Sequence, residues 1–260
     1  MNFKNKIILI VGASSGMGRV VALKLAAAGA KLVVTARRKD KLENLAADIK
    51  AKGGDCLAVA ADALDERAAE AVVKSTVEHF GKIDVVLLNA GGAPAIDMRQ
   101  MNAADVRHYM QTNYDVVVNY LFPVLDQMRI QKSGLVAHTN SLAGFIGVPL
   151  QGPYSAAKGA VRLLMDTCRL EFAEYGIKFT SIYPGFVATE ITKNDGMPAP
   201  MEISEEKAAD YILYALRKEK SDYLFPPVMK WLIRLALVLP KPILNLILKR
   251  DVPPLTNNKI

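Results

Sequence analysis

A tyrosine, a lysine and an upstream serine in this chain could together move a proton to or from an oxygen atom. Tyr154 and Lys158 are four residues apart, so on a helix they share one face and the ammonium lies close to the phenol. An unperturbed phenol titrates near pH ~10, and a nearby cation lowers that pKa toward the range useful for acid–base chemistry. Ser141 lies thirteen residues upstream of Tyr154. On their own, Tyr154 and Lys158 fit an ordinary helix surface equally well.

A glycine-rich turn near the start of the chain suits a phosphate group. An apolar run at 6–11 predicts a buried strand, and a helical pattern follows at 19–28. The turn between them has the spacing G-x-x-x-G-x-G, and its free N–H groups at a helix N-terminus would point at an anion. A glycine turn without function is the alternative. The residues expected to bind a cofactor here are Gly12, Ser14, Ser15, Gly16, Met17 and Gly18.

The end of the second predicted strand, at 31–36, favours NADP over NAD. A fold specific for NAD usually places a carboxylate at this point to bind the ribose. Here Ala36 is followed by Arg37, Arg38 and Lys39, so cations stand where a 2′-phosphate would lie and no acid repels it. A solvated basic turn is the alternative.

Strands and helices alternate through the first half of the chain. Helices are expected at 41–52 and 66–80, and strands at 56–60 and 83–88. This β-α-β-α-β order predicts an α/β fold, a Rossmann-like doubly wound parallel sheet with helices on both faces. Ligands of such sheets bind at the carboxyl ends of the strands, where Asp62 and Asn89 also fall.

The second half continues this pattern and contains the chemical residues. A long, mostly helical segment at 103–128 includes Asn113, a mediocre residue for a helix interior. Pro153 fits the first turn of the helix that carries Tyr154 and Lys158. The remaining elements are expected as strands at 135–139, 177–182 and 223–225, a turn at 183–189 and a helix at 205–218.

The composition predicts one large domain that needs neither a disulfide nor a metal. The chain has 260 residues, of which 51% are hydrophobic and 23% charged, enough for a sizeable core. Cys56 and Cys168 are far apart, which fits a reducing compartment. The histidines and acids lack metal-ligand spacing, and no signal peptide is expected because a strand begins almost at once. We therefore expect a cytoplasmic protein.

The end of the chain differs from the rest in charge and pattern. Residues 215–260 hold nine Lys or Arg and three Asp or Glu, which gives +6 of the net +7. Within 228–250 the polar residues fall on one helical stripe and the remainder is apolar, with one tryptophan, Trp231. Pro240 and Pro242 divide this segment into two short helices and argue against a membrane span. Peripheral contact with the cytoplasmic face of a membrane, and packing on the core or a second subunit, both stay open.

Nucleic-acid binding is not expected of this tail. Its apolar content is high, and no aromatic platform alternates with the cations.

Residues 5–226 resemble the short-chain dehydrogenase/reductase family. The family motif T-G-x-x-x-G-x-G is matched at 11–18, with Val11 in place of the threonine. The family motif N-N-A-G is matched at 88–91, with Leu88 in place of the first asparagine. Both departures remove a group that usually braces the backbone near the cofactor, which weakens local hydrogen bonding more than it threatens the chemistry.

The resemblance implies an NADP(H)-dependent enzyme that interconverts a ketone or aldehyde and an alcohol. By this resemblance, Tyr154 is expected to donate the proton and Ser141 to hold the carbonyl oxygen of the substrate. Lys158 lowers the Tyr154 pKa and binds the nicotinamide ribose, and Asn113 positions a water that links Lys158 to solvent. Further cofactor contacts are expected from Arg37, Arg38, Asp62, Ala63, Asn89, Ala90, Gly91, Pro184, Gly185, Val187 and Thr189.

These patterns lead us to expect a catalytic domain at 1–227 and a helical extension at 228–260. The resemblance also implies that 190–201 covers the substrate and that the chain forms a homodimer or homotetramer. We expect the substrate to be a small carbonyl or alcohol compound, apolar or lipid-like. The alternative is a non-catalytic NADP-binding protein that uses the fold for regulation or scaffolding.

Overall fold

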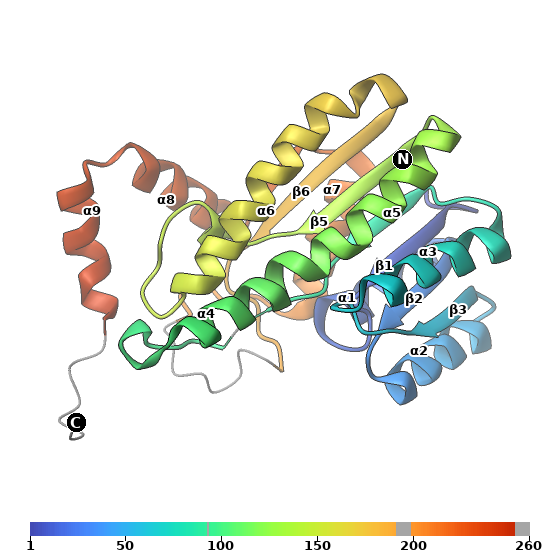
Figure 1. Cartoon of the computed structure of the whole chain (residues 1–260), viewed down its shortest axis with the longest axis horizontal. Coiled ribbons are helices and arrows are strands. Elements are labelled where there is room, and N and C mark those ends of the chain that lie inside the picture. The colour runs from blue at the N-terminus through green and yellow to red at the C-terminus, as the bar shows by residue number, and fades with distance from the viewer. Residues whose placement is uncertain (93, 191–198, 253–260) are drawn as a thin grey trace.

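A parallel sheet forms the centre of the molecule (Figure 1). This computed structural model describes residues 1–92, 94–190 and 199–252, and within them one sheet has the strand order β3-β2-β1-β4-β5-β6-β7. The strands are β1 Ile7–Val11, β2 Lys31–Ala36, β3 Asp55–Ala60, β4 Val85–Leu88, β5 Gly134–Thr139, β6 Ile177–Pro184 and β7 Asp222–Phe225. All pairs are parallel, which confirms the expected doubly wound sheet.

The strand order reverses direction between β1 and β4. Chain connections from β1 lead outward to β2 and β3, and the chain then returns to place β4 on the other side of β1. Val11, the last residue of β1, pairs with Thr35 in β2 and Leu88 in β4. The carboxyl ends of these three strands are therefore level, and a crevice for a ligand forms at such a switch point.

Helices cover both faces of the sheet (Figure 1). Their bounds are α1 Gly16–Ala27, α2 Lys39–Ala51, α3 Glu66–Phe80, α4 Ala103–Met110, α5 Val116–Gln131, α6 Gly152–Glu171, α7 Glu205–Lys218, α8 Pro227–Val238 and α9 Lys241–Leu248. Short 3-10 turns occur at Met98–Gln100, Leu142–Gly144, Ala173–Tyr175 and Lys249–Asp251. Helices α1, α2 and α7 pack on one face, and α3, α5 and α6 pack on the other.

The apolar periodicity of the sequence explains this layering. All five residues of β1 are buried, as a strand with helices on both faces requires. Helix α3 begins after Asp65, whose carboxylate accepts a hydrogen bond from the Ala68 N–H, and ends at Gly81 with a φ of 85°.

The predicted long helix at 103–128 is interrupted. A single π-helical turn, Gln111–Asp115, separates α4 from α5. Such turns shift the backbone hydrogen bonds by one residue and occur often at functional sites. Asn113 lies at the centre of this turn.

Two short helices, α8 and α9, follow the last strand. They lie beyond the end of α6 and on the opposite side of the molecule from α2 and α3 (Figure 1). In the described part of the chain, no helix combines the length and apolarity needed to cross a bilayer.

Candidate active site

A large cleft opens at the carboxyl ends of the strands. Its volume is about 1270 Å³, and it runs from the glycine turn after β1 past Tyr154 to helices α8 and α9. Small-molecule sites are typically ~300–1,000 Å³, so this cleft exceeds the usual range. It has room for more than one small-molecule ligand.

Glycine is required at two positions of the turn that follows β1. Gly12 has a φ of 87°, and a side chain there would stand 2.8 Å from the Ala90 main-chain nitrogen. A side chain at Gly18 would stand 2.1 Å from the Gly12 carbonyl oxygen. Gly18 itself is buried in α1 and does not line the cleft. The structure therefore places it in close packing against Gly12 and not, as expected, in direct contact with a cofactor.

Asn89 ties this turn to the end of β4. Its side-chain nitrogen donates a hydrogen bond of 3.2 Å to the Gly12 carbonyl oxygen. Its side-chain oxygen is buried and has no hydrogen-bond partner among the described residues. An unused buried acceptor beside the phosphate turn suits a ligand with donor groups.

The two departures from the family motifs lie in the apolar core. Val11 and Leu88 are buried and pack in the same cluster, on the face covered by α3, α5 and α6. Each of these two apolar side chains is therefore surrounded by other buried apolar side chains.

Arg38 reaches across the glycine turn. Its guanidinium donates to the Ser14 hydroxyl at 3.0 and 3.2 Å and to the Ser15 hydroxyl. It also lies 3.5 Å from the carboxylate of Glu190, an exposed pair of modest strength. Arg37 lines the cleft beside it. The arginines thus stand at the edge of the cleft where β2 ends.

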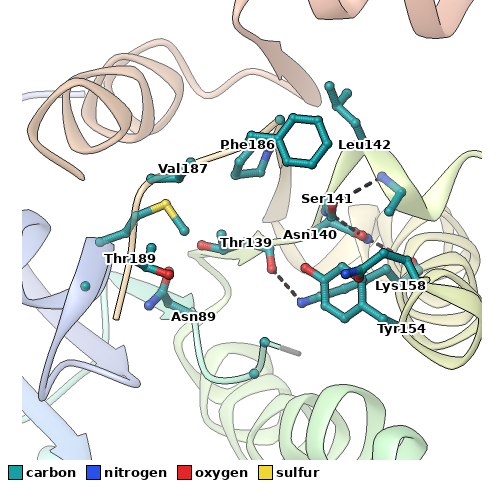
Figure 2. Close-up of a pocket in the computed structure, with 18 of the residues that line it drawn as sticks. Asn89, Thr139, Asn140, Ser141, Leu142, Tyr154, Lys158, Phe186, Val187 and Thr189 are labelled. Atoms are coloured by element: carbon teal, nitrogen blue, oxygen red, sulfur yellow. Dashed lines mark hydrogen bonds between the residues drawn. The ribbon is translucent and has the colours of Figure 1, made fainter. Parts of the chain in front are cut away.

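Ser141 and Tyr154 meet on the other side of the opening (Figure 2). The Ser141 hydroxyl acts to lower the pKa of the Tyr154 phenol and accepts a hydrogen bond of 3.1 Å from the Ala143 N–H. Asn140 holds the main chain at Ser141 in place, because its side-chain oxygen accepts a hydrogen bond of 2.8 Å from the Ser141 N–H. Its amide nitrogen donates to the Lys158 carbonyl oxygen at 3.1 Å, which joins β5 to α6.

Lys158 lies buried beside Tyr154. Its ammonium donates a hydrogen bond of 3.1 Å to the Thr139 carbonyl oxygen and lies 5.6 Å from the centre of the Tyr154 ring. Figure 2 shows this bond, with the lysine and the phenol next to each other. The one-face arrangement expected from the four-residue spacing is therefore present.

The pKa shifts differ from the sequence-based expectation. Burial raises the pKa of Tyr154 to about 12, and the hydrogen bond with Ser141 only partly opposes this. Burial also lowers the pKa of Lys158 to about 8. Both shifts have one cause, because removing water disfavours the phenolate of one residue and the ammonium of the other. In this structure the Tyr154 phenol is therefore held in its protonated form.

Asn113 stands behind the cleft and does not line it. Its side-chain oxygen accepts from the Gly92 N–H at 2.7 Å, and its nitrogen donates to the carbonyl oxygens of Gly92 and Tyr109 at 3.2 and 3.1 Å. These bonds are made at the π-helical turn, where the regular α-helical hydrogen-bond pattern is interrupted. The side chain is fully buried and holds the loop after β4, so its role here is to position that loop.

The other expected cofactor residues line the cleft: Gly12, Ser14, Ser15, Gly16, Met17, Asp62, Ala63, Ala90, Gly91, Pro184, Gly185, Val187 and Thr189. Asn89, Val187 and Thr189 lie across the opening from Tyr154 and Lys158 (Figure 2). Most of the segment expected to cover the substrate, 191–198, lies outside the described residues. In the part of the chain that is described, no cluster of three His, Cys, Asp or Glu side chains could hold a metal ion.

Several residues of the site were not anticipated from the sequence. Asn140 and Thr139 position Ser141 and Lys158, and their place directly before Ser141 was a usable signal. Asn119 donates to the Ala63 carbonyl oxygen at 3.0 Å and so holds the turn after β3. The apolar side chains of α8 and α9 line the cleft, and only the tertiary structure shows this.

Comparison with known proteins identifies the class. The sequence profile of the short chain dehydrogenases matches residues 6–198, well over half of the chain. The chain therefore belongs to the short-chain dehydrogenase/reductase family of oxidoreductases, which confirms the resemblance seen in its motifs.

Related proteins cover most of the chain. An uncharacterized oxidoreductase of Listeria monocytogenes is 35% identical over 228 residues, or 83% of this chain and 92% of that protein. A 3-oxoacyl-(acyl-carrier-protein) reductase of Synechocystis is 35% identical over 190 residues, or 73% of this chain and 77% of that protein. The crystal structure of a short chain dehydrogenase/reductase from Burkholderia phymatum in complex with NAD has a TM-score of 0.84. It covers 98% of this chain and 99% of its own at 23% identity, which shows a shared fold.

Proposed function

We propose that this chain is an NADPH-dependent reductase of ketones or aldehydes with an apolar, lipid-like body. The observation that supports this most is the placement of Ser141 and Tyr154 together with the buried Lys158 in one largely apolar cleft. This arrangement presents a protonated phenol to an oxygen atom, which the reduction of a carbonyl group requires.

The residues at the cleft fit a nicotinamide dinucleotide. The turn at Gly12 and Gly18 has no space for side chains, and the N-terminus of α1 begins at Gly16, on the cleft wall. Free N–H groups at a helix start favour a pyrophosphate. The unpaired Asn89 side-chain oxygen offers an acceptor next to it. Arg37 and Arg38 would hold the 2′-phosphate of NADP, and Asp62 and Ala63 would border the adenine.

The cofactor supplies a hydride to the carbonyl carbon when it is bound. Tyr154 gives its phenolic proton to the carbonyl oxygen, and Ser141 orients that oxygen through its hydroxyl. Lys158 stabilises the negative charge that develops on the phenol, because its ammonium lies against the ring. In the reverse direction the Tyr154 phenolate would be the base, and a pKa of about 12 disfavours it at neutral pH.

The cleft favours an apolar substrate. Beyond Ser141 and Tyr154 its walls include Ile146, Met229, Leu232 and Ile233. Burial of apolar surface contributes ~25 cal/mol per Å², so a lipid-like body would gain more there than a polar one. Relatives named as 3-oxoacyl-(acyl-carrier-protein) reductases support a carbonyl on a linear chain as one form of this substrate.

The surface supports an oligomer that forms through α5 and α6. Phe122 and Ile130 on α5 and Leu163 and Leu170 on α6 are exposed, with 50%, 79%, 59% and 79% of their surfaces in solvent. Both helices lie on the same face of the sheet (Figure 1). We infer a homodimer or homotetramer with this face at the contact. We also propose that the protein is cytoplasmic and that residues 228–250 attach it peripherally to a membrane.

Consumption of NADPH with a panel of aldehydes and ketones of increasing chain length tests this function. We expect turnover with NADPH, a rise of kcat/KM with chain length, and no turnover with charged short oxo acids. A chain that binds NADPH but reduces no member of the panel would contradict the proposal and support the non-catalytic alternative.

A further inference from the structure

Helices α8 and α9 follow one another directly and have two different apolar faces; the two helices with their short connection are called the α8–α9 hairpin here. In Figure 1, α9 stands apart from the sheet, and α8 connects it to β7. Ile233 is the only buried residue of α8 or α9 among those described, and it packs near Leu142 and Tyr183. Few residues of the two helices are therefore buried against the rest of the protein.

The inner face of the hairpin is a wall of the active-site cleft. Six residues of α8 and its end line the cleft, and three residues of α9 face them: Met229, Leu232, Ile233, Leu235, Ala236 and Leu239, then Leu244, Ile247 and Leu248. Every one of them is apolar. Asp251, just after α9, is a charged residue of the same lining. The cleft that contains Tyr154 and Ser141 therefore continues into a mostly apolar channel beside the two helices.

The outer face is apolar as well but does not line the cleft. Val228, Trp231, Val238 and Leu246 have 54%, 64%, 77% and 67% of their surfaces exposed. Trp231 lies between two cations, with Lys230 at 5.7 Å and Arg234 at 5.1 Å from its ring. An exposed tryptophan flanked by cations on an apolar helix is typical of the membrane–water interface.

The charge on this hairpin favours an anionic partner. Residues 228–250 contain five Lys or Arg and no Asp or Glu. Within residues 1–92, 94–190 and 199–252, none of these five cations forms an ion pair with a carboxylate. A two-fold contact with a second copy would bring five cations against five cations, which is unfavourable. Each Lys or Arg near an anionic leaflet instead contributes ~1 kcal/mol to the free energy of membrane binding.

We propose that the α8–α9 hairpin docks on an anionic lipid surface and that the substrate enters the cleft from the bilayer, along the inner face of the hairpin. The bilayer covers the outer apolar face, while the inner face offers a continuous apolar path to Tyr154. The substrate is then a lipid-soluble carbonyl compound that resides in the membrane. This statement of the substrate class rests on the proposed reductase function, whereas the docking does not.

Sedimentation with vesicles tests the docking. Wild-type protein is expected to bind vesicles of phosphatidylcholine with phosphatidylglycerol, to release them as salt is added, and to ignore pure phosphatidylcholine. The double variant Lys230→Glu, Arg234→Glu should bind the anionic vesicles about tenfold more weakly or worse. The matched control Lys52→Glu, Lys74→Glu makes the same change of net charge on α3 and at the end of α2, and should bind like wild type. Leu246→Asp should also weaken binding, since it places a charge on the outer apolar face.

A second measurement tests entry from the bilayer. Reduction of dodecanal held in the anionic vesicles is compared with reduction of butanal in water. The Lys230→Glu, Arg234→Glu variant should lose about tenfold in kcat/KM for dodecanal and keep its rate with butanal, because neither side chain lines the cleft.

The outcomes separate the two proposals. Wild-type protein that ignores anionic vesicles at low salt overturns the docking, and so does a Leu246→Asp chain that binds them normally but dissociates into smaller oligomers. Equal loss of vesicle binding in the control pair would show a nonspecific effect of net charge and would also overturn it. Vesicle binding without turnover of either aldehyde leaves the docking standing and overturns the reductase function instead.

Discussion

The Lys158 ammonium lies 5.6 Å from the centre of the Tyr154 ring and is anchored to the Thr139 carbonyl oxygen. The lysine is thus placed where its charge can stabilise a phenolate, and Ser141 acts to lower the pKa of the Tyr154 phenol. Tyr154 and Lys158 come from α6 and Ser141 from the turn after β5, and Asn140 joins these two segments. The proposed acid Tyr154, Lys158 and Ser141 are therefore held together by hydrogen bonds between α6 and the end of β5.

The first prediction concerns pH. Reduction needs a protonated Tyr154 and a charged Lys158, and both states are present at low pH. As pH rises, Lys158 loses its proton first, because burial lowers its pKa to about 8 while the pKa of Tyr154 is raised to about 12. We expect kcat for reduction, measured at saturating NADPH, to be level on the acid side and to fall through an apparent pKa near that of Lys158.

The variant Lys158→Arg provides the comparison for this profile. An arginine keeps its charge throughout the accessible range, so the alkaline fall should disappear even if the overall rate is lower. An unchanged alkaline fall in Lys158→Arg would show that another group controls it.

The second prediction concerns the choice of cofactor. We expect wild-type protein to bind NADPH more tightly than NADH. Arg38→Ala should raise the dissociation constant for NADPH about tenfold or more, since a hydrogen bond to a charged group contributes ~1.5–3 kcal/mol. Arg37→Asp should weaken NADPH binding and spare or improve NADH, because attraction becomes repulsion.

Lys41→Ala is the control for both arginine variants. It removes a cation from the same basic segment, yet Lys41 faces Glu190 and does not line the cleft. Fluorescence titration of the two nucleotides gives the constants. Equal constants for NADPH and NADH in the wild-type protein would refute the preference.

The third prediction concerns Asn113. Replacement by alanine removes the bonds to the partly buried N–H and carbonyl groups of Gly92, and leaves the Tyr109 carbonyl with only a long bond of 3.4 Å from the Thr112 hydroxyl. Unfolding in urea should show a loss of about 1–3 kcal/mol in the free energy of unfolding, because an unsatisfied buried group costs about that much. Loosening of the loop after β4 should also lower kcat/KM.

Asn245→Ala is the matched control, since Asn245 is exposed on α9. A surface change of this kind is expected to alter stability by less than ~0.5 kcal/mol. If Asn113→Ala is equally mild, the hydrogen bonds of Asn113 do not hold the loop.

The sheet and the phosphate turn could be predicted because their signals are local. The run from Ile7 to Val11 is continuously apolar because the strand is buried on both faces, and glycines follow because the main chain bends sharply there. The spacing of Tyr154 and Lys158 places them on one face of α6 for the same reason of helical geometry.

Other features depend on contacts between distant residues and could not be predicted. The π-helical turn contains Asn113, whose side chain bonds to Gly92, twenty-one residues away. The direction of the Tyr154 pKa shift follows from burial, which the sequence does not display. The inner face of α8 and α9 likewise becomes a cleft wall only when α8 packs near Leu142 and Tyr183.

The reaction of the Tyr154→Phe variant with NADPH and an aliphatic aldehyde tests the central claim most directly. The change removes the phenolic hydroxyl and keeps the ring. We expect kcat to fall ~10²–10⁴-fold, the usual contribution of a general acid, while NADPH binding by fluorescence titration stays close to wild type. The control Tyr183→Phe removes a buried hydroxyl that bonds to Asp222 outside the cleft and should keep kcat. A Tyr154→Phe enzyme that retains more than about a tenth of the wild-type kcat would show that Tyr154 is not the proton donor and would contradict the account.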